Sequence, residues 1–197
     1  MQNSKNDKKK GIRDAIDYVE LLANLDETPV LHEARLLLLL LAFAGDDNSG
    51  SIDGIAKLAK LDFLLRYPTL LKKALEVKGC STKSFFVADN EMFSVESEMV
   101  RYRFGPWDCR YRLFLNVLVS EKLINILSAD HKVVISLTEQ GFCFAKELSK
   151  QPSLQIYSDR ALILKRHFNL TSKNLMNFIY NTFPEIVSLD SETRIII

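Results

Sequence analysis

The sequence predicts a mainly helical protein of the α+β class, in which a winged-helix core with short β-hairpins is flanked by further helices. Apolar residues recur at helical spacing, and two β-rich runs, 122–127 and 133–137, surround a five-residue polar turn that is typical of a two-stranded wing. With 197 residues, 47% of them hydrophobic, the chain is long enough to bury a core. We expect a disordered basic tail over 1–10, a core domain over 11–150, and a helical extension over 151–197 that packs on the core.

Two helices are expected at the start of the folded part. Apolar residues recur at three- and four-residue spacing over 11–25. The run 31–45 is so apolar that its helix should be buried on most of its circumference. Thr28-Pro29 separates the two helices, and Gly45 stands where a C-terminal cap is expected.

The stretch 51–77 has the rhythm of a helix-turn-helix. A first short helix is expected to begin at Ser51 or Asp53, and Asp62 is expected to cap a second. In a DNA-reading helix-turn-helix, the second helix begins with polar side chains that reach base edges. Here that helix begins DFLL, which argues against sequence-specific DNA binding through it.

The third group of helices follows the wing. Thr138 is expected to cap a helix through Leu148. Two more helical stretches, 158–168 and 172–183, come next, and Thr171 is placed to cap the second of them.

Charge limits the class of partner. The formal net charge is +1, and the first thirteen residues hold five basic residues against one acidic residue, so the remaining chain is slightly negative. A folded body near neutrality does not favour general nucleic-acid binding. In the cluster 57–68, apolar residues are expected on one side and Lys57, Lys60 and Arg66 on the other.

No motif for catalysis, metal binding or cofactor binding is recognisable, so we expect neither an enzyme nor a bound cofactor. The histidines, His32, His131 and His167, are far apart and lie at no metal-ligand spacing from Asp, Glu or Cys. The chain also lacks a phosphate-cradling glycine loop and a dinucleotide fingerprint.

The expected location is the cytoplasm, with no membrane contact. The most apolar run, 36–44, is far shorter than the roughly twenty residues of a spanning helix. No secretory signal is recognisable at the N-terminus. Three free cysteines, Cys80, Cys109 and Cys143, suit a reducing compartment.

The segment 99–112, MVRYRFGPWDCRYR, combines four Arg, two Tyr, a Phe and the only Trp. Gly105-Pro106 is expected to form a turn, and Asp108 to cap the following helix. Guanidinium groups bind carboxylates or phosphates, and aromatic rings offer flat contact area. The alternative is that Trp107 fills the core and the Arg side chains pair with acids of the chain.

Four Arg are many to satisfy internally, so we favour an interface, and the near-neutral body favours a protein partner. The residues expected to bind it are Arg66, Tyr67, Arg101, Tyr102, Arg103, Gly105, Pro106, Trp107, Asp108, Arg110 and Tyr111.

Four stretches together resemble a known family: KLDFLLRYP, MVRYRFGPWDCRYR, EKLINIL and ISLTEQG, within about residues 30–150. They resemble the middle components of bacterial ABC-three-component systems, which include the small accessory subunit of Lamassu-type anti-phage defence. In that family's pattern a proline often follows the Trp-Asp pair, where this chain has Cys109.

The resemblance implies a non-catalytic subunit that bridges an SMC/Rad50-like ABC ATPase and an effector, expected to be a nuclease. It implies that the effector is restrained until foreign DNA is sensed, and that DNA is contacted only within the complex. The family motif is carried by Arg101, Arg103, Gly105, Pro106, Trp107, Asp108 and Tyr111. The alternative is a winged-helix transcription regulator that binds duplex DNA as a dimer, with affinity that falls steeply with salt.

Overall fold

The computed structural model describes residues 29–188, apart from 83–84, 86, 88–99, 103–104 and 130–131. The helix expected over 11–25, the basic tail and the C-terminal end lie outside these residues. The described elements are α2 (Pro29–Ala44), β1 (Ile52–Asp53), α3 (Ile55–Arg66), α4 (Pro68–Val77), β2 (Val100–Tyr102), β3 (Gly105–Trp107), α6 (Tyr111–Ser120), β4 (Ile124–Ala129), β5 (Lys132–Leu137), α7 (Glu139–Ser149), a 3₁₀ turn (Pro152–Leu154), α8 (Gln155–Phe168), α9 (Ser172–Thr182) and α10 (Pro184–Ser188). The protein is therefore mainly helical with a small antiparallel sheet, which confirms the α+β class.

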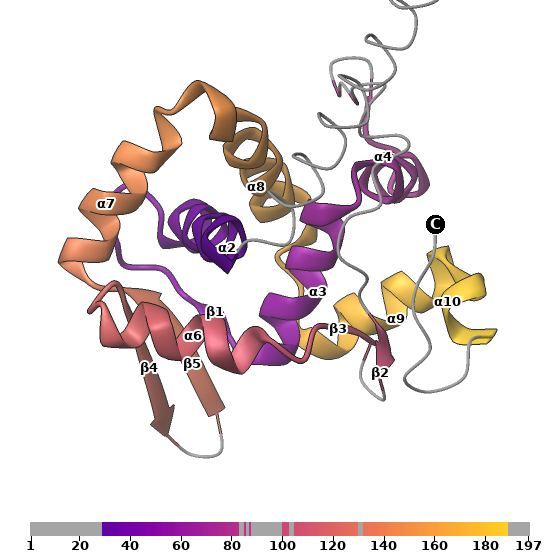
Figure 1. Ribbon diagram of the computed structural model, residues 1–197. Coiled ribbons are helices and arrows are strands. Elements are labelled where there is room, and N and C mark those ends of the chain that lie inside the picture. The colour runs from indigo at the N-terminus through magenta and orange to yellow at the C-terminus, as the bar shows by residue number, and fades with distance from the viewer. Residues whose placement is uncertain are drawn as a thin grey trace, which may run out of the picture.

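Helix α2 is the centre of the fold. Its axis passes between α7, α8, α3 and the sheet, and those elements surround it (Figure 1). Its leucine run is buried nearly all round, as the sequence predicts, because neighbours cover every side. The helix ends at Ala44, and Gly45 follows with a φ of 77°, the left-handed conformation of a C-terminal cap.

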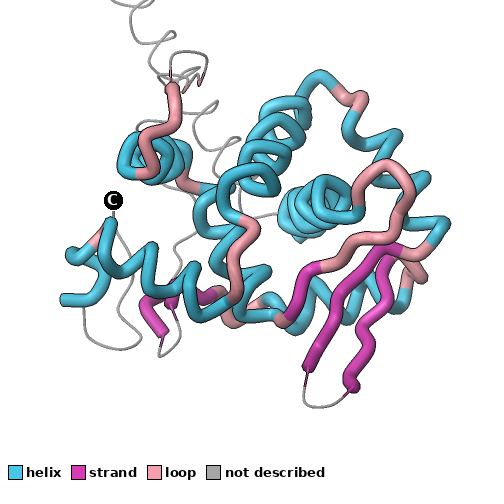
Figure 2. The backbone as a smooth tube through the Cα atoms, turned by 180° about the vertical axis from the view of Figure 1, so that it is seen from behind, coloured by secondary structure: helices cyan, strands magenta, loops and turns pink. Residues whose placement is uncertain are grey.

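The β-hairpin predicted around the 128–132 turn is present as β4 and β5. These strands pair antiparallel from Ile124–Leu137 to Ala129–Lys132, so each reaches further into the turn than the sequence indicates. The sheet order is β1-β5-β4, and β4 is an edge strand. The sheet lies at one side of the molecule and α9 and α10 lie at the other (Figures 1 and 2).

Helix α7 begins at the predicted cap. The Thr138 hydroxyl accepts the Gly141 N–H at 2.9 Å and donates to the Lys122 carbonyl at 2.6 Å, so it joins the helix to the start of the wing. A Cβ on Gly141 would lie 1.8 Å from the Leu123 carbonyl oxygen. Glycine is therefore required where α7 crosses the chain that enters β4.

The helix boundaries predicted within 51–77 are wrong. Ser51 and Asp53 cap no helix, because residues 52–53 form β1 and pair with β5. One continuous helix, α3, then runs from Ile55 to Arg66, with Asp62 inside it. The break comes at Tyr67, since the residue before a proline disfavours the helical conformation, and Pro68 begins α4.

The predicted division of 57–68 into an apolar side and a basic side does not separate buried from exposed residues, since Lys57, Lys60 and Arg66 are all buried with the apolar residues of α3. The Lys57 ammonium donates to Asn169 Oδ1 at 2.8 Å, between α8 and α9. The Lys60 ammonium donates to the Ala56 carbonyl at 2.9 Å and to Ser172 Oγ, the first residue of α9, at 3.2 Å. The C-terminal helices cover this side of α3, which local sequence cannot reveal.

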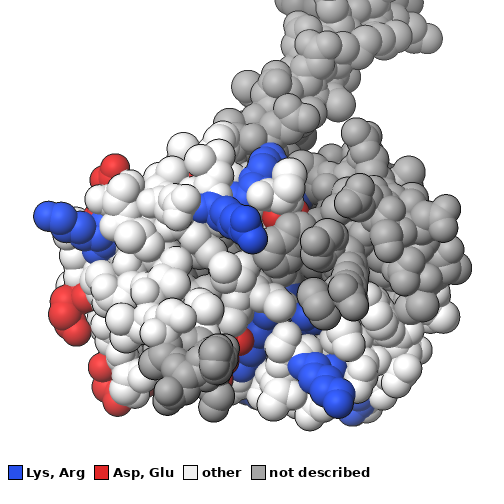
Figure 3. All heavy atoms as spheres, turned by 90° about the horizontal axis from the view of Figure 1, so that it is seen from below, with Lys and Arg blue, Asp and Glu red and all other residues white. Residues whose placement is uncertain are grey.

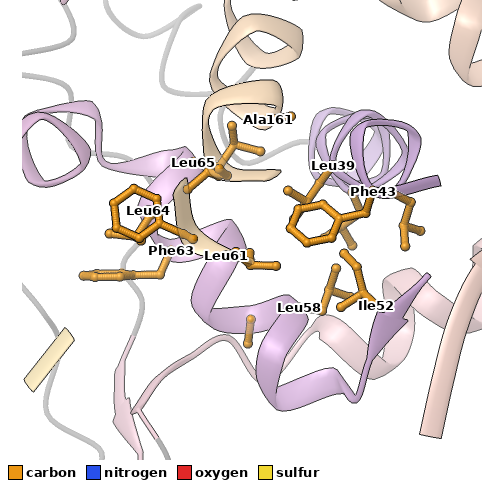
Figure 4. Close-up of a cluster of buried hydrophobic side chains, with 14 of the residues drawn as sticks. Leu39, Phe43, Ile52, Leu58, Leu61, Phe63, Leu64, Leu65 and Ala161 are labelled. Carbon is orange, nitrogen blue, oxygen red and sulfur yellow. The ribbon is translucent and has the colours of Figure 1, made fainter. Parts of the chain in front are cut away.

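The C-terminal helices complete the core. Helix α8 packs on α2 and α3, and α9 packs on α3 and α4. The Thr171 hydroxyl accepts the Asn174 N–H at 3.3 Å, which confirms the predicted cap of α9. Apolar side chains of α2, β1, α3 and α8 meet in one cluster (Figure 4): Leu39, Phe43, Ile52, Leu58, Leu61, Phe63, Leu64, Leu65 and Ala161.

Candidate functional site

The two sequence clusters singled out above meet where α3 packs against the start of α6. Asp62 and Arg66 lie on α3, while Asp108, Arg110 and Tyr111 lead into α6. We call these five residues the α3–α6 junction. Their segments are more than forty residues apart in sequence, so tertiary packing alone brings them together.

Charged and hydroxyl groups inside the junction are paired with one another. The Tyr111 hydroxyl donates to Asp62 Oδ2 at 2.6 Å, and the Arg66 guanidinium donates to Asp108 Oδ2 at 3.2 Å. Arg66 also lies 4.0 Å from Asp62 Oδ2. Burial and the Asp62 carboxylate raise the pKa of Tyr111 well above its usual value, so its hydroxyl remains a donor.

Asp108 is held by Arg110 as well as by Arg66. Its Oδ1 accepts the Arg110 backbone N–H at 2.9 Å and Nε at 3.0 Å, and its Oδ2 accepts the second guanidinium nitrogen at 2.8 Å. Burial acts to raise the pKa of Asp108, but the hydrogen bonds and charge of Arg110, with the charge of Arg66, outweigh it and lower the pKa to about 2. Asp108 does not cap α6 as predicted, because its carboxylate closes a turn over 109–110 and the helix begins at Tyr111.

Helix α2 covers the junction with a histidine ring and a third arginine, Arg35. The His32 ring stacks on Phe114 with centroids 4.9 Å apart, and the Arg35 guanidinium lies against His32 Nδ1. The Arg110 guanidinium covers the Phe114 ring at 5.4 Å. Burial, assisted by the charge of Arg35, lowers the pKa of His32 to about 3, so the imidazole is neutral at physiological pH.

The predicted partner-binding residues fall into two groups. Arg66, Asp108 and Tyr111 are buried, and Arg110 is partly buried; all four have partners within the chain. Tyr67 is partly buried, with its ring 5.2 Å from that of Phe63. For Arg66 and Arg110, pairing with an acidic residue of the chain is the alternative that the sequence left open.

The second group lies in the hairpin β2–β3, which packs on α3 and α9 through β3. Its register pairs Tyr102 with Gly105 and Arg101 with Pro106. Gly105-Pro106 therefore belongs to a strand and not to a turn, and proline is tolerated because a two-stranded ribbon has free edges. Arg103 and the side chain of Trp107 lie outside the described part of the chain.

The sequence analysis missed an exposed surface on α6 and β4, which we call the α6–β4 surface. The exposed apolar side chains of these two elements are Leu113 (56% exposed) and Val119 of α6 and Ile126 and Leu127 (63% exposed) of β4, of which the last two are consecutive and project from opposite faces of the strand. Arg112 supplies the single charge in the sequences of the two elements. Seen from below, the described surface is mostly uncharged, with the Lys, Arg, Asp and Glu side chains in separate groups (Figure 3). The uncharged run LINILSA was the available signal, but it was interpreted only as a strand.

Within the described residues, no group of three or more His, Cys, Asp or Glu could hold a metal ion. Among the same residues, no helix has the length and apolarity needed to cross a membrane. The chain matches no protein-family model, no curated protein and no solved structure.

Proposed function

We propose that the chain is a non-catalytic adaptor built on a winged-helix core, which binds a protein partner through the α6–β4 surface and the neighbouring β2–β3 hairpin. The observation that carries this proposal is the chemistry of the exposed part of α6. Here Leu113 and Val119 flank Asn116, and Arg112 is the one cation.

The order of elements supports the winged-helix core. A helix, a short strand and a second helix (α2, β1, α3) are followed by α6, the hairpin β4–β5 and a closing helix α7. β5 lies between β1 and β4, so the hairpin extends from the helices as a wing. In this arrangement α6 takes the place of the recognition helix, and residues 67–110 replace the short turn that normally joins it to the preceding helix.

The exposed residues of α6 favour a protein over duplex DNA. A recognition helix needs side chains that hydrogen-bond base edges and cations that neutralise phosphates. Leucine and valine do neither, and β4 adds no charge to the single Arg112. Exposed apolar side chains on adjacent elements are instead typical of protein interfaces.

The junction supports a positioning role for the Arg- and aromatic-rich segment. Asp108 follows β3 directly and is bound by Arg66 of α3 and by Arg110. Both ion pairs fix the base of the β2–β3 hairpin against the core, because buried charge pairs tolerate few alternative geometries. The motif thereby fixes the point at which the hairpin leaves the core, just before α6 begins.

The sequence resemblance supplies the partner class. We propose an SMC-like ATPase as the protein that meets this surface, with an effector nuclease held elsewhere on the adaptor until foreign DNA is sensed. The fold requires no catalytic residue for this role. DNA contact belongs to the assembled complex and not to the isolated chain.

Co-purification tests the proposal. The tagged chain is expressed with the proteins encoded beside it, as wild type, as Leu113→Asp and as the control Leu162→Asp on α8. Leu113 and Leu162 are 56% and 58% exposed, so both substitutions place a charge on similarly open surface. We expect Leu113→Asp to lose the large partner and Leu162→Asp to retain it. Retention by both variants would contradict a contact through α6.

A salt titration of duplex DNA binding distinguishes the adaptor from the alternative, a DNA-binding transcription regulator. The isolated adaptor should bind duplex DNA weakly or not at all. Tight binding that weakens steeply as salt rises would favour a DNA-binding regulator instead.

A further inference from the structure

We propose that Cys80 and His167 form a nucleophile–base pair that makes Cys80 the chain's selective site of covalent modification by peroxides and other soft electrophiles. Cys80 follows α4 and His167 lies in the last turn of α8, 87 residues away. Cys80 Sγ is 3.4 Å from His167 Nδ1. A thiol within hydrogen-bonding reach of an imidazole is the arrangement that activates cysteine as a nucleophile.

The end of α4 fixes the position of Cys80. Gly79 has a φ of 71° and donates its N–H to the Glu76 carbonyl at 2.9 Å. The Cys80 N–H donates to the Leu75 carbonyl at 2.9 Å. These two bonds form a Schellman motif, which closes the helix and holds the residue after the glycine in one backbone conformation. The backbone that carries the thiol is therefore fixed by the end of the helix.

Lys78 binds the backbone of His167. The Lys78 ammonium donates to the His167 carbonyl at 2.5 Å. The same ammonium lies over the rings of Phe168, at 5.0 Å, and Phe178, at 5.7 Å. This contact ties the end of α4, two residues before Cys80, to the residue whose ring faces the thiol.

The reaction needs the His167 tautomer that carries its proton on Nε2 and leaves Nδ1 free to accept. The thiol proton moves from Sγ to Nδ1, and the thiolate attacks one oxygen of a hydroperoxide. A sulfur–oxygen bond forms as the oxygen–oxygen bond breaks, and the departing oxygen takes the proton from the imidazolium. Cysteine is oxidised by two electrons to a sulfenic acid, and the peroxide is reduced to water or an alcohol.

The two other thiols provide controls within the same molecule. Cys109 and Cys143 are both exposed, whereas Cys80 is half-buried. Within the described residues, neither control thiol has a hydrogen bond to a histidine. Exposure alone therefore predicts that Cys80 reacts slowest, and activation by His167 predicts that it reacts fastest.

The test is the alkylation rate of each thiol in the folded full-length chain, with iodoacetamide at pH 6 and pH 8 and site-resolved mass spectrometry. The thiolate is the reactive form of cysteine, and among the described residues Cys109 and Cys143 have no histidine placed to accept the thiol proton, so they should react slowly at pH 6. We expect Cys80 to react at least about tenfold faster than either at pH 6. Equal or slower reaction of Cys80 would overturn the proposal without any variant.

His167→Gln provides the second arm. Circular dichroism first shows that the variant is folded, after which its Cys80 should react at pH 6 no faster than the exposed control thiols. With hydrogen peroxide, a dimedone adduct should form at Cys80 in the wild type and be lost in the variant. An unchanged Cys80 rate in folded His167→Gln would exclude the imidazole as the activating base.

Discussion

Helices α3 and α6 share the buried junction, yet they differ in what surrounds them. Every residue of α3 from Lys57 to Arg66 is buried, including two lysines, an aspartate and an arginine. Helix α6 is buried along one side, through Tyr111, Phe114, Leu115 and Leu118, and its other side is open. The elements α2, α8, α9 and β3 pack on α3, whereas α6 packs mainly on α2 and β4 and meets α3 through Tyr111 at its first residue.

The two helices therefore reverse the usual pattern, in which charged side chains are exposed and apolar side chains are buried. The enclosed helix carries charged side chains that join it to the elements around it, and the open helix carries apolar side chains toward solvent. Charged groups on α3 therefore serve the fold. The exposed residues on α6 are the ones that we propose to contact a partner.

The largest expected effect comes from breaking the junction at Asp108. Asp108→Ala leaves Arg66 buried without its carboxylate, and removing one member of a buried ion pair typically costs about 3–5 kcal/mol. We expect a loss of that size in the free energy of unfolding, measured by urea denaturation. The control is Glu147→Ala, which removes an exposed pair with Lys150, at 2.6 Å, and should change little. Similar results for both variants would mean that the junction does not hold α3 and α6 together.

Acid should weaken the same region through His32. Its pKa is about 3 in the folded chain and 6.5 when exposed, so between these pH values the unfolded chain binds a proton that the folded chain excludes. The free energy of unfolding should therefore fall by up to about 1.4 kcal/mol per pH unit as the pH drops below 6.5. Asp108, whose pKa of about 2 lies below its usual 3.8, adds a further loss below about pH 4.

Urea denaturation at pH 7, 6, 5 and 4 checks this dependence. The variant His32→Gln has no titrating side chain at position 32 and keeps an acceptor for Arg35. The free energy of unfolding of this variant should therefore change much less between pH 6.5 and pH 5. A wild-type chain whose stability is constant over that range would contradict a buried neutral His32.

Lys60 on α3 should show a smaller effect of opposite sign. Burial lowers its pKa from 10.5 to about 8, which means that its charged form is less stable inside the fold than in water. Lys60→Met has a similar length and no charge, so we expect it to raise the free energy of unfolding by about 1–2 kcal/mol. The comparison variant is Lys72→Met on exposed α4 surface, for which we expect no gain. A destabilised Lys60→Met would show that its bonds to Ala56 and Ser172 outweigh the burial.

The smallest effect on stability belongs to α6. Leu113→Asp changes an exposed side chain, and such substitutions usually stay within about 0.5 kcal/mol. We expect its urea midpoint to match that of the wild type while partner binding is lost. A clear loss of stability would place Leu113 in the fold and not in an interface.

Local signals predicted the elements that are determined locally. The leucine run of α2, the wing strands and the caps at Thr138 and Thr171 follow from periodicity and turn chemistry within a few residues. Asp62 was misinterpreted because it resembles an N-cap, whereas its partner Tyr111 lies 49 residues away. Tertiary burial overrides local capping preference at such a position.

Long-range contacts explain what could not be predicted at the candidate site. The burial of Lys57 and Lys60 depends on residues of the α8–α9 region more than a hundred positions later. The exposure of Leu113 depends equally on which elements leave α6 uncovered. The segment 99–112 was identified by composition alone, but composition did not show that Arg110 and Arg66 share one carboxylate.

The central claim is that this chain acts inside a protein assembly. Its most direct test is mass photometry of the tagged wild-type chain purified after expression with the proteins encoded beside it. The account predicts an assembly far heavier than the 22.5 kDa chain, with an SMC-like ATPase among its subunits. A lone species at the mass of one chain or a dimer would contradict it.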